Sequence, residues 1–311
     1  MKNFADRLIE QIQAKKSAVC VGLDPRLSKI PSFIQEAALK ENPKNKLKAA
    51  AEAIIEFNKG IIDAVHDLVP CVKPQVAFYE LFGEEGMRAY RETIAYAKAK
   101  GLLVIADVKR NDIGSTAEAY AQAFLGETDV FGESMSVFDA DAVTITPYLG
   151  WDGIKPFLEA CRKDGKGVFI LVKTSNPSSA DLQDLQMEDK NSVYEIIGNF
   201  VESWGSDEIG EKGYSSVGAV VGATYPDQAG KLRKIMPTSI FLVPGYGAQG
   251  GGAEDVKPCF NEDGLGAVVN SSRGIIFAYE KSDEYDEGDY GKAARAAVVE
   301  MNEDLGAVVK F

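Results

Sequence analysis

Eight short apolar runs, each followed by turn residues and most by a helical stretch, constrain the fold of this 311-residue chain more than any other feature. Most runs are apolar throughout, which is typical of parallel strands covered on both faces. Their repetition predicts an α/β fold, a (β/α)8 TIM barrel forming a single domain over residues 1–311. The expected strands are Ala18–Leu23, Leu68–Lys73, Leu102–Val108, Ala142–Thr146, Val168–Lys173, Val217–Gly222, Ile240–Val243 and Ala267–Asn270.

Helical periodicity and capping signals predict the segments between these strands. Ser115 and Ser192 each stand three residues before a glutamate, the pattern of a capping box, and Gly101 is placed to end a helix. A doubly wound open sheet would show a similar alternation and is the alternative fold, although the number of strands favours the barrel. The expected helices span Lys46–Val65, Gly86–Lys100, Ser115 to about Phe124, Ser192 to about Trp204, Asp227–Ile235 and Tyr290–Leu305.

Two polar segments interrupt the pattern. Thr174–Asn191 is long enough to be a lid or a surface excursion, and Glu280–Asp289 is an acidic run that we expect to be a solvated loop.

Charge and cysteine usage limit the partners and the compartment. The net charge of −13 disfavours binding to nucleic acid or to anionic lipid. No apolar run approaches membrane-spanning length, and the N-terminus lacks the apolar core of a signal peptide. The four cysteines are scattered without a CxxC pair, which disfavours a zinc site or a disulfide framework. We therefore expect a cytoplasmic protein with no membrane or nucleic-acid partner.

Charged and polar residues stand where several of the expected strands end. In a barrel these carboxyl ends and the loops after them build the active site, and an unpaired charge buried there would be costly. The residues are Asp24, Lys73, Asp107, Lys109, Thr146, Lys173 and Arg273. Lys173 is either catalytic or a side chain that projects into a loop.

The densest cluster lies at the end of the third expected strand. Because side chains alternate along a strand, Asp107 and Lys109 point the same way, into the barrel mouth if Ile105 faces the interior. Asp112 follows just beyond the strand. A salt bridge that stabilises the rim is the alternative to a catalytic role, and related barrels use such carboxylates to bind a metal.

A phosphate site is predicted from the loops after the last two strands. The glycine-rich run Pro244–Gly252 allows backbone N–H groups to approach an anion, and Asn270–Gly274 places Arg273 at the start of a short helix. Since the only histidine, His66, lies near a helix end, no Ser-His-Asp triad is expected.

The motifs of this chain resemble those of the orotidine 5′-phosphate decarboxylase family, in its longer branch. The motif Asp107-Val108-Lys109-Arg110-Asn111-Asp112-Ile113-Gly114-Ser115-Thr116 looks like the signature of that family. The family's other motifs follow in the same order, and the match spans Asp24 to Gly274: Val21-Gly22-Leu23-Asp24-Pro25, Val72-Lys73-Pro74-Gln75, Thr146-Pro147-Tyr148, Pro244-Gly245-Tyr246-Gly247-Ala248-Gln249-Gly250 and Ser272-Arg273-Gly274.

The resemblance implies a homodimer that converts orotidine 5′-monophosphate to UMP and carbon dioxide without a cofactor or a metal. It implies that Lys109 protonates C6, that Asp107 faces the substrate carboxylate, and that Lys73 and Asp24 contact the ribose, with Lys73 also bonded to Asp107. The other residues it implies are Asp112 and Thr116 in the partner's site, Thr146 and Pro147 near the pyrimidine, and Gly247, Gln249, Gly250, Arg273 and Gly274 at the phosphate.

Elementary chemistry agrees with this assignment. Loss of carbon dioxide from C6 leaves a carbanion in the ring plane, and no cofactor motif in the sequence offers an electron sink. A fixed cation such as Lys109, kept protonated by Asp107 and Asp112, supplies electrostatic stabilisation. A magnesium-dependent sugar-phosphate barrel and a non-catalytic nucleotide-binding barrel are the rival functions.

Overall fold

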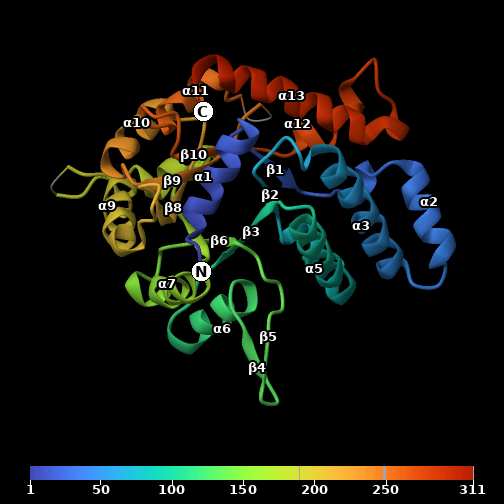
Figure 1. Cartoon of the computed structure of the whole chain (residues 1–311), viewed down its shortest axis with the longest axis horizontal. Helices are drawn as coiled ribbons and strands as arrows, with labels where there is room; N and C mark the ends of the chain where they lie inside the picture. Colours follow the sequence, from blue (N-terminus) through green and yellow to red (C-terminus); the bar gives the residue numbers. More distant parts are fainter. Residues whose placement is uncertain (189, 248–249, 311) are drawn as a thin grey trace.

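The computed structural model describes residues 1–188, 190–247 and 250–310. Eight parallel strands close into a barrel in the order β1-β10-β9-β8-β7-β6-β3-β2, and helices surround it as a single α/β domain (Figure 1). The predicted barrel is therefore confirmed and the open sheet is not formed. The barrel strands are β1 (Val19–Leu23), β2 (Cys71–Pro74), β3 (Leu103–Arg110), β6 (Ala142–Ile145), β7 (Gly167–Lys173), β8 (Ser215–Val221), β9 (Ser239–Pro244) and β10 (Ala267–Ser271).

Every predicted strand has a counterpart, and only the ends differ. The largest difference is in β2, which begins at Cys71 rather than at Leu68. Pro70 precedes this strand and has no N–H to donate to a ladder, although its carbonyl accepts the N–H of Leu103 at 3.2 Å. The ladder therefore starts one residue after the proline.

The predicted helices are also present, with changes at their beginnings. The capping box at Ser192 is confirmed, since Ser192 N donates to Glu195 Oε2 at 2.8 Å. The capping box predicted at Ser115 is wrong, because the helix starts at Gly114 and Ile113 is its N-cap without a side-chain cap. The longer helices are α1 (Phe4–Lys15), α2 (Ser32–Glu41), α3 (Lys46–Val65), α5 (Gly83–Ala99), α6 (Gly114–Phe124), α7 (Trp151–Asp164), α9 (Val193–Gly205), α10 (Pro226–Ile235) and α13 (Tyr290–Val308).

Shorter elements fill the connections. A two-stranded antiparallel hairpin, which the sequence did not predict, projects from the barrel (Figure 1). Its strands are β4 (Thr128–Val130) and β5 (Glu133–Met135), and the one-turn helices are α4 (Ala77–Glu80), α8 (Ala180–Gln183), α11 (Ala253–Val256) and α12 (Arg273–Ile276). The 3-10 turns are η1 (Leu27–Lys29), η2 (Pro177–Ser179), η3 (Ser206–Glu208), η4 (Lys257–Cys259), η5 (Ala278–Lys281) and η6 (Glu287–Asp289).

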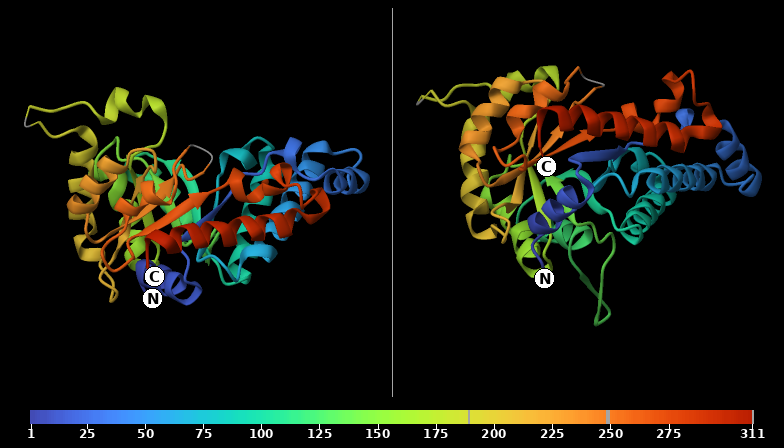
Figure 2. Two further views of the ribbon diagram at one scale, coloured as in Figure 1. Left: turned by 90° about the horizontal axis from the view of Figure 1, so that it is seen from above. Right: turned by 45° about the horizontal axis from the view of Figure 1, so that its top comes forward.

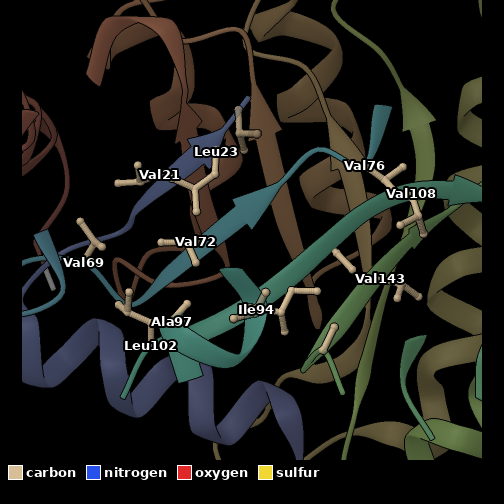
Figure 3. Packing of buried hydrophobic residues seen from close by; sticks show 14 of the residues in the cluster. Val21, Leu23, Val69, Val72, Val76, Ile94, Ala97, Leu102, Val108 and Val143 are labelled. Carbon is tan, nitrogen blue, oxygen red and sulfur yellow. The ribbon is translucent and has the colours of Figure 1, made fainter. Parts of the chain in front are cut away.

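Side chains of the strands alternate between two apolar layers. Val104, Ala106 and Val108 of β3 belong to the layer between barrel and helices, where Val72 and Val108 are seen in Figure 3. Ile105 belongs instead to the barrel interior. This confirms the expectation for Ile105, and it assigns Asp107 to the interior face.

Helix α1, which the sequence did not predict, closes one end of the barrel (Figure 2). Its residues Phe4, Leu8 and Ile12 are buried in the same cluster as the interior strand residues. Phe4 meets Phe169 of β7 edge to face, with ring centroids 6.0 Å apart. Because this end is covered, the carboxyl ends of the strands form the open mouth.

Both polar segments contain short helical turns. The described residues 174–188 contain η2 and α8, and they rise at the opposite end of the molecule from α1 (Figure 2, left). Glu280–Asp289, predicted to be a solvated loop, is largely exposed but includes turns of 3-10 helix. Among the described residues, no helix is both long enough and apolar enough to cross a bilayer.

Candidate active site

A cavity of about 460 Å³ opens at the carboxyl ends of the strands. One part of its wall is apolar, formed by side chains that end the interior layer of the barrel. The other part is charged or polar. The lining residues are Leu171, Val220, Leu242 and Pro244, together with Lys73, Asp107, Lys109, Thr144, Thr174, Ser175, Asn176 and Gln183.

Asp107 stands between two ammonium groups in this cavity. Lys73 Nζ donates to Asp107 Oδ2 at 2.6 Å, and Lys109 Nζ donates to Asp107 Oδ1 at 2.5 Å. The side chains of Lys73 and Asp107 are 6% and 7% exposed, whereas that of Lys109 is 45% exposed. Two members of the predicted cluster, Asp107 and Lys109, are therefore brought together with Lys73, and Lys109 is the accessible one, whereas Asp112 does not join them within the single chain.

The charges keep these buried groups ionised. Burial by itself raises the pKa of Asp107, but the charges of Lys73 and Lys109 and their hydrogen bonds outweigh burial and hold that pKa well below its usual range. For Lys73, burial lowers the pKa, but the charges of Asp107 and Asp24 outweigh burial and raise it above its usual range. Asp107 is thus an anion flanked by two cations at neutral pH.

Asp24 follows β1, next to this cluster. Its Oδ1 atom is buried and has no hydrogen-bond partner among the described residues. A buried carboxylate oxygen without a donor is costly. The atom can therefore accept one further hydrogen bond, although Asp24 is not among the described residues that line the cavity.

The predicted pyrimidine contacts lie in the loop after β6, outside the wall of this cavity. Neither Thr146 nor Pro147 is among the residues that line the cavity in the described part of the chain, and Thr146 N donates to Arg110 O at 3.2 Å. Thr144, two residues earlier, lines it instead. Sequence reasoning missed Thr144 because it stands inside an apolar strand.

The polar residues after β7 were also missed as site residues. Thr174, Ser175 and Asn176 directly follow this strand, and Gln183 of α8 holds Thr174 in place. Gln183 Oε1 accepts the backbone N–H of Thr174 at 2.9 Å, and its Nε2 donates to Thr174 Oγ1 at 2.8 Å. The signal that could have found the first three is their place directly after an apolar strand, the same as for the predicted residues at other strand ends.

The loops after β9 and β10 lie together, as the phosphate prediction requires. Gly247 and Gly274 line one small cavity of about 200 Å³. Gly247 and Gly250 have φ values of +68° and +94°, which favour glycine. Arg273 is exposed and begins α12, but this helix has only four residues, so the charge of Arg273 matters more than a helix dipole. Gln249 lies outside the described residues.

The residues expected to reach a partner subunit are on the surface of the single chain. Asp112 is half-buried and its Oδ1 accepts the N–H of Ile113 at 2.8 Å. Thr116 is exposed in the first turn of α6. Within the described ranges neither residue lines the cavity.

The rival metal site has no support from clustering of ligands. Among the described residues, no group of three His, Cys, Asp or Glu side chains is arranged to hold a metal ion. His66 caps the C-terminus of α3, and its Nδ1 lies 3.1 Å from Asp63 O.

Named proteins resemble this chain along nearly its whole length. A relative from Caldicellulosiruptor bescii, named orotidine 5′-phosphate decarboxylase, is 47% identical over 310 residues, which cover 99% of this chain and 100% of the relative. A relative of the same name from Rhodopirellula baltica is 47% identical over 308 residues, covering 98% and 99%.

Solved structures agree with the sequence similarity. Leishmania donovani OMP decarboxylase has a TM-score of 0.72 and 33% identity, over 98% of each chain. A putative orotidine 5′-phosphate decarboxylase from Streptomyces avermitilis has a TM-score of 0.77 and 32% identity, over 99% of this chain and 96% of the other. The family model that matches residues 17–287 shows that this chain belongs to the orotidine 5′-phosphate decarboxylase / HUMPS family.

Proposed function

We propose that this protein converts orotidine 5′-monophosphate to UMP and carbon dioxide, the last step of UMP biosynthesis. The names of its near full-length relatives support this reaction. The observation that carries the proposal is the position of Asp107 between Lys73 and Lys109 on the wall of the cavity.

The reaction needs a cation beside C6 of the substrate. When the bond between C6 and the carboxylate breaks, carbon dioxide leaves and the electron pair stays on C6, in the ring plane. The ammonium of Lys109 stabilises this charge and then gives its proton to C6, and solvent returns a proton to the amine. The half-exposed side chain of Lys109 supports this role, because its nitrogen can meet a ligand.

Asp107 would then face the substrate carboxylate. The low pKa of Asp107, held down by its two lysines despite burial, supports an ionised carboxylate at neutral pH. Repulsion between the two carboxylates is relieved when carbon dioxide departs, and this favours the transition state.

The remaining contacts orient the nucleotide. Lys73 and Asp24 bind the ribose hydroxyls, and the unpartnered oxygen of Asp24 supports this. The polar edge of the pyrimidine lies against Ser175 and Asn176, and the position of both residues on the cavity wall supports this contact. Thr146 and Pro147, in the loop after β6, also contact the pyrimidine. Arg273 and Gln249, with Gly247, Gly250 and Gly274, hold the phosphate.

Homodimer formation and a cytoplasmic location belong to the same proposal. Asp112 and Thr116 complete the site of a second copy in a homodimer, which fits their position on the surface of the chain. All four cysteines are buried and free, which fits a cytoplasmic protein.

An ultraviolet assay of orotidine 5′-monophosphate in metal-free buffer with EDTA tests the proposed reaction. Full turnover in EDTA is the expected result. Turnover that requires added Mg²⁺ would favour the metal-dependent rival. Tight binding of UMP with no loss of orotidine 5′-monophosphate would favour the non-catalytic rival, and either outcome would overturn the proposal.

A further inference from the structure

Thr144 connects β6 to the part of β3 that carries Asp107 and Lys109. Its side chain is buried, with 1% of the residue exposed. Thr144 Oγ1 accepts the backbone N–H groups of Val108 and Lys109, each at 3.0 Å. It also donates to Asp107 Oδ1 at 2.9 Å. One hydroxyl group therefore forms hydrogen bonds with three consecutive residues of the neighbouring strand.

The ladder between the two strands is irregular at this place. Ala106 pairs with Val143 and Arg110 pairs with Ile145, with a register shift between them. Three residues of β3 therefore lie opposite Thr144 alone, so the regular ladder cannot pair all of their N–H groups. The Thr144 hydroxyl accepts two of these N–H groups in place of a backbone carbonyl.

The irregularity also places Lys109 in an unusual conformation. Its φ is +46°, in the left-handed region that a residue with a side chain rarely adopts. Such conformations persist where the surrounding structure fixes them. The backbone N–H of Lys109 is held by Thr144, and its Nζ turns back to Asp107, two residues earlier.

The direction of the hydroxyl proton follows from counting. A threonine hydroxyl has one proton to donate and two lone pairs to accept with. Because two N–H groups occupy the lone pairs, the proton must point to Asp107. The Asp107 carboxylate is then fixed by donors from Lys73, Lys109 and Thr144.

We propose that Thr144 is a positioning residue for the decarboxylation proposed above: its hydroxyl holds the β3 bulge and so sets the place of the Lys109 ammonium relative to Asp107. This inference rests on the proposed function for its kinetic consequence, but the structural part of it stands on the hydrogen bonds alone.

Thr144→Val tests the role, because valine keeps the shape and removes the hydroxyl. We expect kcat to fall about 100-fold, since small displacements of a catalytic group have effects of this size. The KM and the Kd of UMP should stay within about threefold, since the loss belongs to the transition state. Thr144→Ser keeps the hydroxyl and should restore most of the activity.

Thr93→Val is the matched control for simple loss of a buried hydroxyl group. Thr93 is 2% exposed, and its Oγ1 accepts Asn58 Nδ2 at 3.1 Å, away from the cavity. A purely structural role for Thr144 predicts that both variants lose stability and both keep kcat. If Thr144→Val does not fold, Thr144→Ala removes the same hydroxyl without placing a methyl group against the two N–H groups.

Hydrogen exchange of the peptide over residues 104–112 separates this inference from the proposed reaction. We expect faster exchange in Thr144→Val than in the wild type and in Thr93→Val. Unchanged exchange, or a kcat within about threefold of the wild type, would overturn the inference. If the wild-type protein fails to decarboxylate the nucleotide, the proposed function is lost, and the exchange measurement still decides whether Thr144 holds the bulge.

Discussion

Lys109 at the end of β3 and Lys173 at the end of β7 look alike in the sequence, but the structure gives them opposite surroundings. Each lysine ends an apolar strand and each pairs with an aspartate, Asp107 or Asp184. For Lys109 the carboxylate is buried and the lysine side chain is 45% exposed. For Lys173 the lysine side chain is 0% exposed and the carboxylate is 32% exposed.

The difference shows which lysine can meet a ligand. Lys109 lines the cavity, whereas Lys173 Nζ donates hydrogen bonds to Ser179 Oγ at 3.0 Å and to Asp184 Oδ1 at 2.7 Å. Its ammonium also lies 4.5 Å from the centroid of the Tyr225 ring. Lys173 therefore fastens the segment after β7, and the residues that begin that segment line the cavity.

The largest effect is expected from Lys109→Ala. Turnover should fall by at least about 10⁴-fold, because one change removes both the proton donor and the cation beside C6. UMP binding should stay measurable by calorimetry, since Lys73 and the phosphate contacts remain. Near-normal turnover would show that Lys109 is not part of the mechanism. It would then differ from Lys173 only in its exposure.

Asp107→Asn should come next, and it affects stability as well as turnover. It leaves the buried Lys73 ammonium without its main counter-charge, and removal of one partner of a buried pair costs about 3–5 kcal/mol. Urea unfolding at pH 7 measures this loss of free energy of unfolding. A loss below about 1 kcal/mol, the range of a surface pair, would show that the cluster is solvated.

The pH dependence of stability also tests whether Asp107 and Lys73 are charged in the folded protein. Because the pKa of folded Asp107 lies below its unfolded value of about 3.9, its contribution is present above that pH and is lost as the pH falls through the folded pKa. The raised pKa of Lys73 gives a contribution that is present below about pH 10.4 and is lost as the pH rises through the folded pKa. We expect the stability lost by the wild type between pH 7 and pH 3 to exceed that lost by Asp107→Asn by about 1 kcal/mol, because only the first part of the Asp107 contribution is lost above pH 3. Equal losses in the two proteins would contradict this.

Arg273→Ala tests phosphate binding by a third cation, which lies on a surface loop. A charge-assisted hydrogen bond contributes about 1.5–3 kcal/mol, so kcat/KM for the nucleotide should fall roughly 10- to 100-fold. Kinetics with the phosphate-free nucleoside are the control, and there the variant and the wild type should agree. Equal losses on both substrates would argue against phosphate binding by Arg273.

The sequence predicted the parts of the site that follow from which residues end the strands. Lys73, Asp107 and Lys109 were predicted because charged residues that end apolar strands point into the barrel mouth. Thr144 could not be found in this way, because a β-branched residue inside a strand looks like ordinary core. Its role depends on the register shift between β3 and β6, which is a property of strand pairing.

Helix α7 is not among the helices expected from the sequence. It contains Gly153 and Pro156, two residues that usually interrupt helices. A Cβ atom at Gly153 would lie 2.8 Å from Asp112 O, so the glycine allows α7 to approach the loop after β3. Tertiary packing therefore explains a residue that local propensity disfavours.

The smallest effect is expected from Lys173→Met, which completes the comparison with Lys109. Methionine fills a similar volume, and Asp184 can be solvated because its side chain is partly exposed, so stability should change by less than about 2 kcal/mol. Loss of the anchor should speed hydrogen exchange in the segment 174–188 and reduce kcat/KM less than about tenfold, mainly through KM. Asp184→Asn breaks the same ion pair but leaves the buried Lys173 ammonium without its counter-charge, so its loss of stability should be larger, toward about 3–5 kcal/mol, with the same direction of change in hydrogen exchange and in KM. A loss of kcat as large as that of Lys109→Ala, with UMP affinity unchanged, would place Lys173 among the catalytic groups and end the distinction between the two strand ends.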